Sequence, residues 1–239
     1  MSELRRYVTM NNINHRLHRI LFLFLGWSLI VLLPKIVYSQ EMLQKPVLEF
    51  AQKSLKGYVN NVLNEKNFAR FNFKSLEEAR VAHLGDPYKV MFIGLGPLKD
   101  YKSGTGIRPI LIDAKTLWFP VMVEGEIRTK LEVREKKGKL VSGEFGGIRV
   151  VQEIAKVRDQ VPRLIESKGL RGPFKLMVVK IPALYAHFFY VESSQGEYLI
   201  PAMVQPQRYK LENGQIYAAD QALSNLREFA KEIDGKTLM

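Results

Sequence analysis

Two stretches of this sequence repeat the same order of features, and that order constrains the fold more than any other part of the chain. In each stretch a helical segment ends near a glycine, and a turn containing Gly and Pro follows. An apolar strand then begins with an aromatic residue and a lysine, at residues 88–93 in the first stretch and 174–179 in the second. Because an amphipathic helix must bury its apolar face, each stretch predicts a helix packed against strands.

The match between the two stretches continues downstream. Residues 117–123 resemble residues 198–204, each with a central proline, and a polar hairpin is predicted after each, at 129–141 and at 208–218. The second hairpin carries Asn-Gly, a strong turn signal. We interpret the match as an internal duplication, with chance similarity between proline-bounded strands as the alternative. Both prolines lack an amide donor and should lie at strand edges, starts or bulges.

The predicted fold class is therefore α+β, with two helix-plus-antiparallel-sheet units of the form αββββ. The first unit covers residues 75–147, and the second covers 148–239, including a C-terminal helix. Residues 40–74 predict an N-terminal helix and a linker before these units. A helix on one face of a curled antiparallel sheet recurs in cystatin-like folds, so placing the units there is an analogy from element order.

Local signals give the helix boundaries. The motif Ser-Leu-Glu-Glu that begins at Ser75 matches a capping box, and the helix it starts is expected to end near Gly85. A second helix is predicted at residues 148–167, and a last one at 220–233.

Residues 1–39 have the features of a targeting segment. Four arginines come first: Arg5, Arg6, Arg16 and Arg19. An apolar run at 20–33 follows, and Ser39 offers a small residue for cleavage before Gln40, which predicts a signal peptide. A helix of this length spans roughly 21 Å, less than the roughly 30 Å of a hydrocarbon core. The alternatives are an uncleaved signal anchor over residues 20–38 and a buried core helix.

Composition narrows the classes of protein and partner. The chain has 239 residues and no cysteine, which excludes disulfides, thiolate nucleophiles, zinc–cysteine sites and lipoprotein-type anchoring. Its formal net charge is +12, which favours anionic partners, and the expected partner is a protein or an anionic envelope component. The alternative is that the charge serves solubility alone. No nucleic-acid partner is expected, because the aromatic residues lie on apolar strands instead of along a basic stripe. The expected location is periplasmic or secreted, with membrane contact only through an uncleaved N-terminal segment.

A resemblance supports the same location. The segments 84–90, 111–127 and 145–147 together resemble a pattern seen in uncharacterised exported bacterial α+β proteins. The resemblance covers about residues 75–147 and implies export and an α+β fold, but no activity.

The usual signatures of chemistry are missing from the sequence. After residue 39 the histidines are His83, in a predicted helix, and His187, in a predicted apolar strand, and a packing or surface role is expected for both. No zinc or calcium spacing occurs, so neither a metal site nor a cofactor is predicted. Lys102-Ser103-Gly104 mimics a motif of serine β-lactamases, but no S-x-x-K motif accompanies it, and the phosphate-loop spacing is also missing.

The most distinctive segment is residues 94–109, which predicts a long loop rich in glycine. Four of its residues are candidates for binding an anion or a partner: Lys99, Tyr101, Lys102 and Arg108. Long irregular loops in compact domains are often functional. The alternatives are a plain connection or an unrecognised strand near residues 98–101.

The function predicted from the sequence is an exported, non-catalytic binding or accessory protein that acts at the cell envelope or outside the cell. The alternative is an extracytoplasmic hydrolase that uses carboxylates, with four candidates: Glu77, Glu78, Asp86 and Asp113. No residue is assigned a catalytic role, because nothing in the sequence pairs these carboxylates across a cleft.

Overall fold

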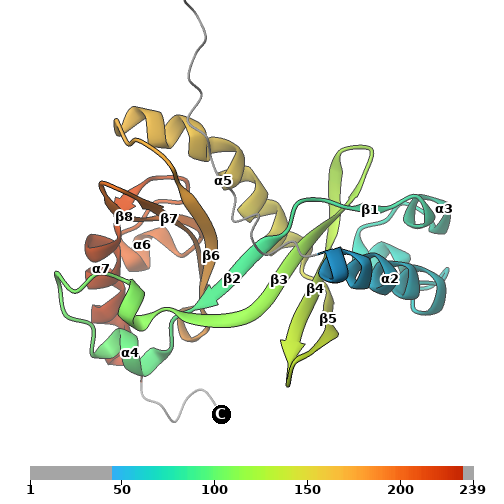
Figure 1. Cartoon of the computed structure of the whole chain (residues 1–239), viewed down its shortest axis with the longest axis horizontal. Coiled ribbons are helices and arrows are strands. Elements are labelled where there is room, and N and C mark those ends of the chain that lie inside the picture. The colour runs from blue at the N-terminus through green and yellow to red at the C-terminus, as the bar shows by residue number, and fades with distance from the viewer. Residues whose placement is uncertain (1–44, 234–239) are drawn as a thin grey trace, which may run out of the picture. The chain divides into compact units, whose positions relative to one another are not determined.

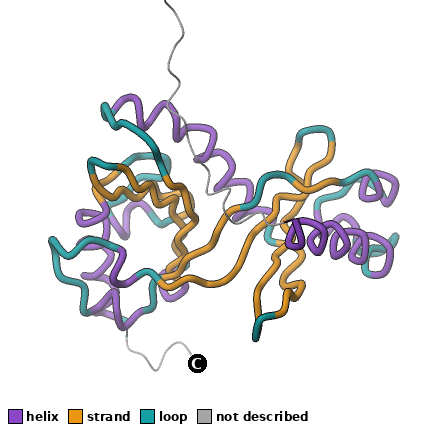
Figure 2. The backbone as a smooth tube through the Cα atoms, in the orientation of Figure 1, coloured by secondary structure: helices purple, strands orange, loops and turns teal. Residues whose placement is uncertain are grey.

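Both predicted units contribute strands to one mixed sheet. The computed structural model describes residues 45–233, and the apolar run at 20–33 lies outside them. Within these residues nine strands are present: β1 His83–Leu84, β2 Tyr88–Phe92, β3 Ile112–Val123, β4 Glu126–Lys136, β5 Lys139–Gly146, β6 Lys175–Ile181, β7 Ala186–Ser193, β8 Gly196–Met203 and β9 Tyr217–Ala218. Their order is β5-β4-β3-β2-β6-β7-β8-β9, with β1 paired to β3. Figure 2 shows these strands in orange.

The neighbouring strands β2 and β6 join the two halves of the sheet. They are parallel, with Val90 opposite Val178, whereas the other paired strands are antiparallel. Each half is a meander that starts at this junction and runs outward, so the sheet is continuous across the boundary at residue 148.

Helices cover both faces of the sheet (Figure 1). The α-helices of the described residues are α2 Lys45–Asn61, α3 Leu76–Arg80, α4 Leu95–Lys99, α5 Ile148–Ser167, α6 Pro206–Tyr209 and α7 Ala219–Glu232. Short 3-10 turns occupy Phe68–Phe71, Arg108–Ile110 and Pro182–Leu184. α5 packs on one face, against core residues from both halves. α2 and α3 pack on the opposite face of β3, β4 and β5, and α4 and α7 pack on the opposite face of β6, β7 and β8.

Strand alternation produces these two faces. On β3, Phe119 points to the α2 side and the neighbouring Trp118 to the α5 side. On β6, Val178 packs under α5, whereas Val179 packs with α7. Because successive side chains of a strand point to opposite faces, one strand supplies both cores.

The structure confirms the predicted α+β class, whereas the strand order does not support the duplication. Pro120 lies on β3, next to β2, but Pro201 lies on β8, which β7 separates from β6. The matched strands therefore take different places in the two halves. Both prolines do lie beside a register shift, as the missing amide donor predicts. The analogy with cystatin-like folds stays a prediction.

Two predicted elements were wrong. The helix that Ser75 caps ends at Arg80 instead of near Gly85. His83, expected in that helix, lies on β1, where it pairs with Met122 of β3. The second polar hairpin does not form: residues 206–209 make α6, since Pro206 supplies a favourable first helical position. Gly214, part of the expected Asn-Gly hairpin turn, instead donates its amide to the carbonyl of Pro201 at 2.8 Å.

Candidate functional site

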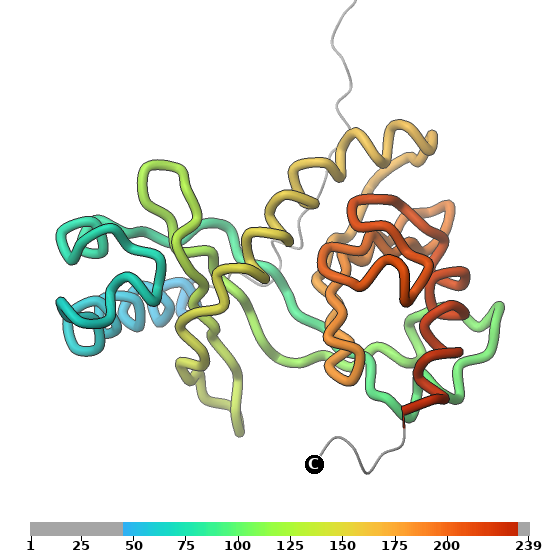
Figure 3. The backbone as a smooth tube through the Cα atoms, turned by 180° about the vertical axis from the view of Figure 1, so that it is seen from behind, coloured from blue at the N-terminus to red at the C-terminus, as the bar shows by residue number. Residues whose placement is uncertain are grey.

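The segment at residues 94–109, predicted to be a long loop, folds against the last helix and two strands. Residues 95–99 form α4, and Leu98 and Ile107 are fully buried in the core that α7 shares. Figure 3 shows this green segment beside α7 in red. The prediction of an irregular loop was therefore wrong, because these two side chains anchor the segment from within.

Of the four predicted binding residues, the structure fixes two along α7. The Lys99 ammonium donates to the carbonyl of Ile233 at 2.6 Å. The Tyr101 hydroxyl donates to Asp220 at 2.6 Å, and burial together with that carboxylate raises the pKa of the phenol. Lys102 is exposed on the following turn. These three residues therefore do not converge on one site.

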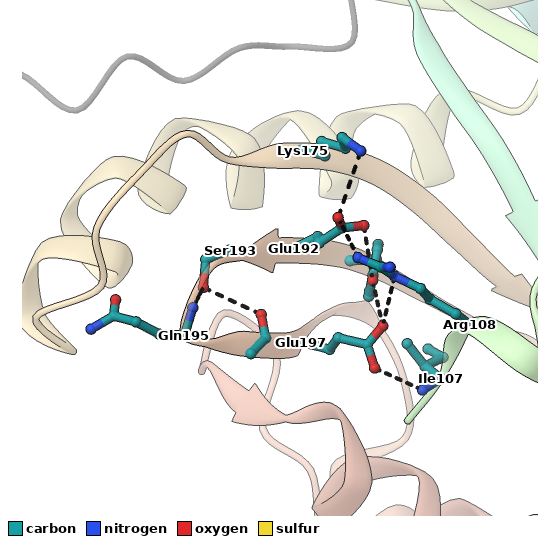
Figure 4. Close-up of polar contacts among 9 residues, drawn as sticks. Ile107, Arg108, Lys175, Glu192, Ser193, Gln195 and Glu197 are labelled. Carbon is teal, nitrogen blue, oxygen red and sulfur yellow. Dashed lines mark hydrogen bonds and ion pairs between the residues drawn. The ribbon is translucent and has the colours of Figure 1, made fainter. Parts of the chain in front are cut away.

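Arg108, the fourth predicted residue, is held by carboxylates from β7 and β8 (Figure 4). Its guanidinium lies 2.5 Å from Glu192 and 3.4 Å from Glu197. Glu197 also accepts hydrogen bonds from the Ile107 amide at 2.9 Å and the Tyr190 hydroxyl at 2.8 Å. These contacts attach residues 94–109 to β7 and β8, and the two carboxylates balance the charge of Arg108.

The four carboxylates of the hydrolase alternative are also dispersed. Three have cationic partners: Glu77 with Arg80 at 3.7 Å, Glu78 with Arg128 at 2.7 Å, and Asp113 with Lys89 at 2.9 Å. Asp86 lines a cavity of about 770 Å³ between α2 and β1. Glu77 and Glu78 lie on α3, Asp113 lies on β3 and Asp86 precedes β2, so the four come from three different segments of the chain.

A groove beside the first turn of α5 brings polar groups from several strands together. It consists of two adjoining pockets of about 440 Å³ each, which share Trp118, Glu144, Lys180 and Pro182. We call it the α5 groove. The Phe92 pocket adds Val90, Phe92 and Ala114 to the shared residues, and the His187 pocket adds Lys130, Gly147 and His187. Each pocket is within the usual size range for small ligands.

One wall of the α5 groove is a network of charges around Trp118. Glu132 lies directly opposite Trp118 on β4 and accepts its indole N–H at 3.0 Å. Lys130, which is 2% exposed, lies 2.7 Å from Glu144, 3.7 Å from Glu132 and 4.4 Å from the centre of the indole ring. Arg134 pairs with the second oxygen of Glu132. These contacts hold Trp118 in place and balance the charges of this wall among themselves.

The part of the groove formed by β6 and β7 carries polar side chains that form no hydrogen bond or ion pair within the described residues. Lys180 on β6 lies directly opposite His187 on β7. His187 is 6% exposed, and neither of its ring nitrogens forms a hydrogen bond within the described residues. Burial, followed by the charges of Lys180 and Lys130, lowers the pKa of His187 to about 4, so the imidazole is neutral at pH 7. Lys180 forms no ion pair within residues 45–233.

The N-terminus of α5 completes this end of the groove. Gly147 is the N-cap, and its φ of 74° favours glycine. It has no side chain to accept from the first amides, and the first turn of α5 carries no acidic residue. The backbone N–H groups of residues 148–150 therefore lack intrahelical partners, and the positive end of the helix dipole lies at the His187 pocket.

Sequence reasoning missed this groove. It treated residues 129–141 as a polar hairpin and His187 as a packed residue. A usable signal was present, because Lys130, Glu132 and Arg134 alternate with apolar neighbours, and such a period places all three charges on one face of a strand. The strand order, which brings Lys180 and His187 to the same face, could not be read from the sequence.

No group of three or more His, Cys, Asp or Glu residues is placed to hold a metal ion within residues 45–233. None of the helices in that range combines the length and apolar character needed to cross a membrane. Comparison of the chain with protein families, curated proteins and solved structures finds no match.

Proposed function

We propose that the chain is a non-catalytic binding module that works outside the cytoplasm and holds its ligand in the α5 groove. One observation carries this proposal: within residues 45–233 the buried imidazole of His187 forms no hydrogen bond, and it lines the groove beside Lys180, which forms no ion pair there. Buried polar groups are normally satisfied, so an unsatisfied cluster at a cavity wall supports a role in binding.

The carboxylate-dependent hydrolase is less well supported. Glu78 and Asp113 are each paired with a cation, and their pKa values are lowered despite the opposing effect of burial, by hydrogen bonds and neighbouring cations. A general acid needs a raised pKa instead. In the α5 groove the carboxylates Glu132 and Glu144 are likewise paired with cations, around Trp118, which favours binding over hydrolysis.

A groove-filling substitution tests the binding role. We expect fragments that bind the full-length chain in ligand-observed NMR to lose at least about tenfold in affinity for the Ala114→Phe variant, because the added ring occupies the Phe92 pocket. The matched control is Val81→Phe, at a position that is 67% exposed and lies outside the groove, and it should keep wild-type affinity.

Circular dichroism confirms that both variants remain folded before their affinities are compared. Equal binding by Ala114→Phe and wild type would place the site elsewhere. A screen that yields no binding fragment would count against a ligand site in the groove.

The proposed location rests on residues 1–39, which lie outside the described residues, and on the resemblance to exported bacterial proteins. The proposed partner outside the cytoplasm is a protein or an anionic envelope component. If the targeting segment is cleaved as its sequence predicts, the mature chain begins at Gln40.

Mass spectrometry of the protein recovered from envelope and culture fractions measures that terminus. An intact Met1 on membrane-bound protein would indicate the signal anchor at residues 20–38. Intact protein in the cytoplasmic fraction would contradict both forms of export.

A further inference from the structure

The charges that line the α5 groove do not cancel. Lys130, Arg134 and Lys180 face Glu132 and Glu144, which leaves one net positive charge. Lys130 and Arg134 are in contact with the carboxylates, whereas Lys180 is not. The uncompensated charge is therefore at Lys180, which lines both pockets.

Two further features place positive potential and hydrogen-bonding capacity beside Lys180. The first amides of α5 lack a cap, and such a helix end attracts anions. Independently, His187 lines the same pocket, and neither ring nitrogen forms a hydrogen bond in the part of the chain that the structure describes. Its pKa is lowered by burial and by the two nearby lysines. A neutral imidazole donates one hydrogen bond, which an anionic oxygen would accept. Glu144 also lines the His187 pocket, where it is paired with Lys130. Its negative charge keeps the net positive charge of the groove at one.

The Phe92 pocket has a different character. Val90, Phe92 and Ala114 line it together with Pro182 and Trp118. These side chains give a ligand an apolar wall. Glu132, Arg134 and Glu144 line the same pocket, but they are paired with one another or with Lys130. A ligand that spans both pockets therefore meets Lys180, which lines both, and the apolar wall of the Phe92 pocket.

We propose that the α5 groove binds a small organic monoanion with an apolar body. Its carboxylate lies between Lys180, His187 and the first turn of α5, and its hydrocarbon part lies in the Phe92 pocket. This assignment of a ligand class rests on the binding role proposed above for the groove.

Isothermal titration of the full-length chain with phenylacetate and its neutral isostere phenylacetamide tests the ligand class. Phenylacetate should bind wild type at least about tenfold more tightly than phenylacetamide, because only the anion pairs with Lys180. Lys180→Gln should remove this difference. Lys175→Gln is the matched control, since it removes the same charge from the other end of β6, where the lysine lies 3.6 Å from Glu192, and it should leave the difference intact.

The outcomes separate this inference from the proposed function. Equal affinity for the two compounds, with both weakened by Ala114→Phe, would overturn the anionic class and leave the groove as a binding site. Phenylacetate binding that survives in Ala114→Phe or Lys180→Gln would overturn the placement of the anion. No measurable heat from millimolar phenylacetate would also overturn the inference. The fragment screen described above tests separately whether the groove binds any ligand.

Discussion

Lowering the pH from 6.5 to 4 is expected to reduce the free energy of unfolding by up to about 3 kcal/mol through His187 alone. Burial, followed by the charges of Lys180 and Lys130, lowers the pKa of His187 from 6.5 to about 4 in the folded chain. Between these values the unfolded state binds the proton and the folded state does not. The contribution of His187 to the free energy of unfolding is therefore fully present above pH 6.5, decreases as the pH falls, and is lost near pH 4.

Urea unfolding followed by circular dichroism across this pH range measures the effect. His187→Gln should remove most of the pH dependence, because the amide is polar, similar in size and does not titrate. His83→Gln is the control, since His83 is exposed on β1, and it should retain the wild-type profile. A His187→Gln variant as sensitive to acid as wild type would show that other groups cause the loss.

Replacing Lys130 by methionine should destabilise the fold by about 2 kcal/mol, because the buried Glu132 loses one of its two cationic partners. Lys130 is 2% exposed, and Glu132 beside it is 7% exposed. The methionine fills a similar volume but leaves Glu132 with Arg134 as its remaining cation.

Glu144→Gln is the matched comparison, because it removes the other partner of the same lysine. The side chain of Glu144 is 55% exposed, so water solvates it and the loss should stay below about 1 kcal/mol. Chemical unfolding at pH 7 of both variants gives the two values. Equal losses of unfolding free energy in the two variants would contradict this explanation. It holds that the burial of the Lys130–Glu132 contact, and not the number of ion pairs removed, determines how much stability is lost.

The sequence predicts the long, strongly periodic elements well. α5 occupies residues 148–167, as its apolar spacing and flanking glycines predict. β2, β3, β6 and β8 also lie where apolar runs bounded by prolines and glycines place them. In these elements local pattern and tertiary packing favour the same structure.

The sequence fails where packing overrides local preference. α4 contains Gly96 and Pro97, both poor helix formers, and it is helical because Leu98 is buried against α7. Two of the predicted binding residues, Tyr101 and Arg108, looked free in the sequence. Their partners Asp220 and Glu197 are about a hundred residues away in the chain, so no local pattern could reveal that they are occupied.

The α5 groove was hidden for a related reason. Its members come from strands that the sequence assigned to two separate sheets, and the parallel pairing of β2 with β6 places them on one face. Lys180 and His187 look unremarkable inside apolar strands until that pairing is known.

Chemical-shift mapping with the tightest-binding fragment tests most directly whether the α5 groove is the binding site. In ¹⁵N-labelled full-length protein, the account predicts the largest shifts at the amides of residues 148–150, the indole N–H of Trp118 and the ring of His187. Shifts confined to residues 94–110, or to the cavity between α2 and β1, would contradict it.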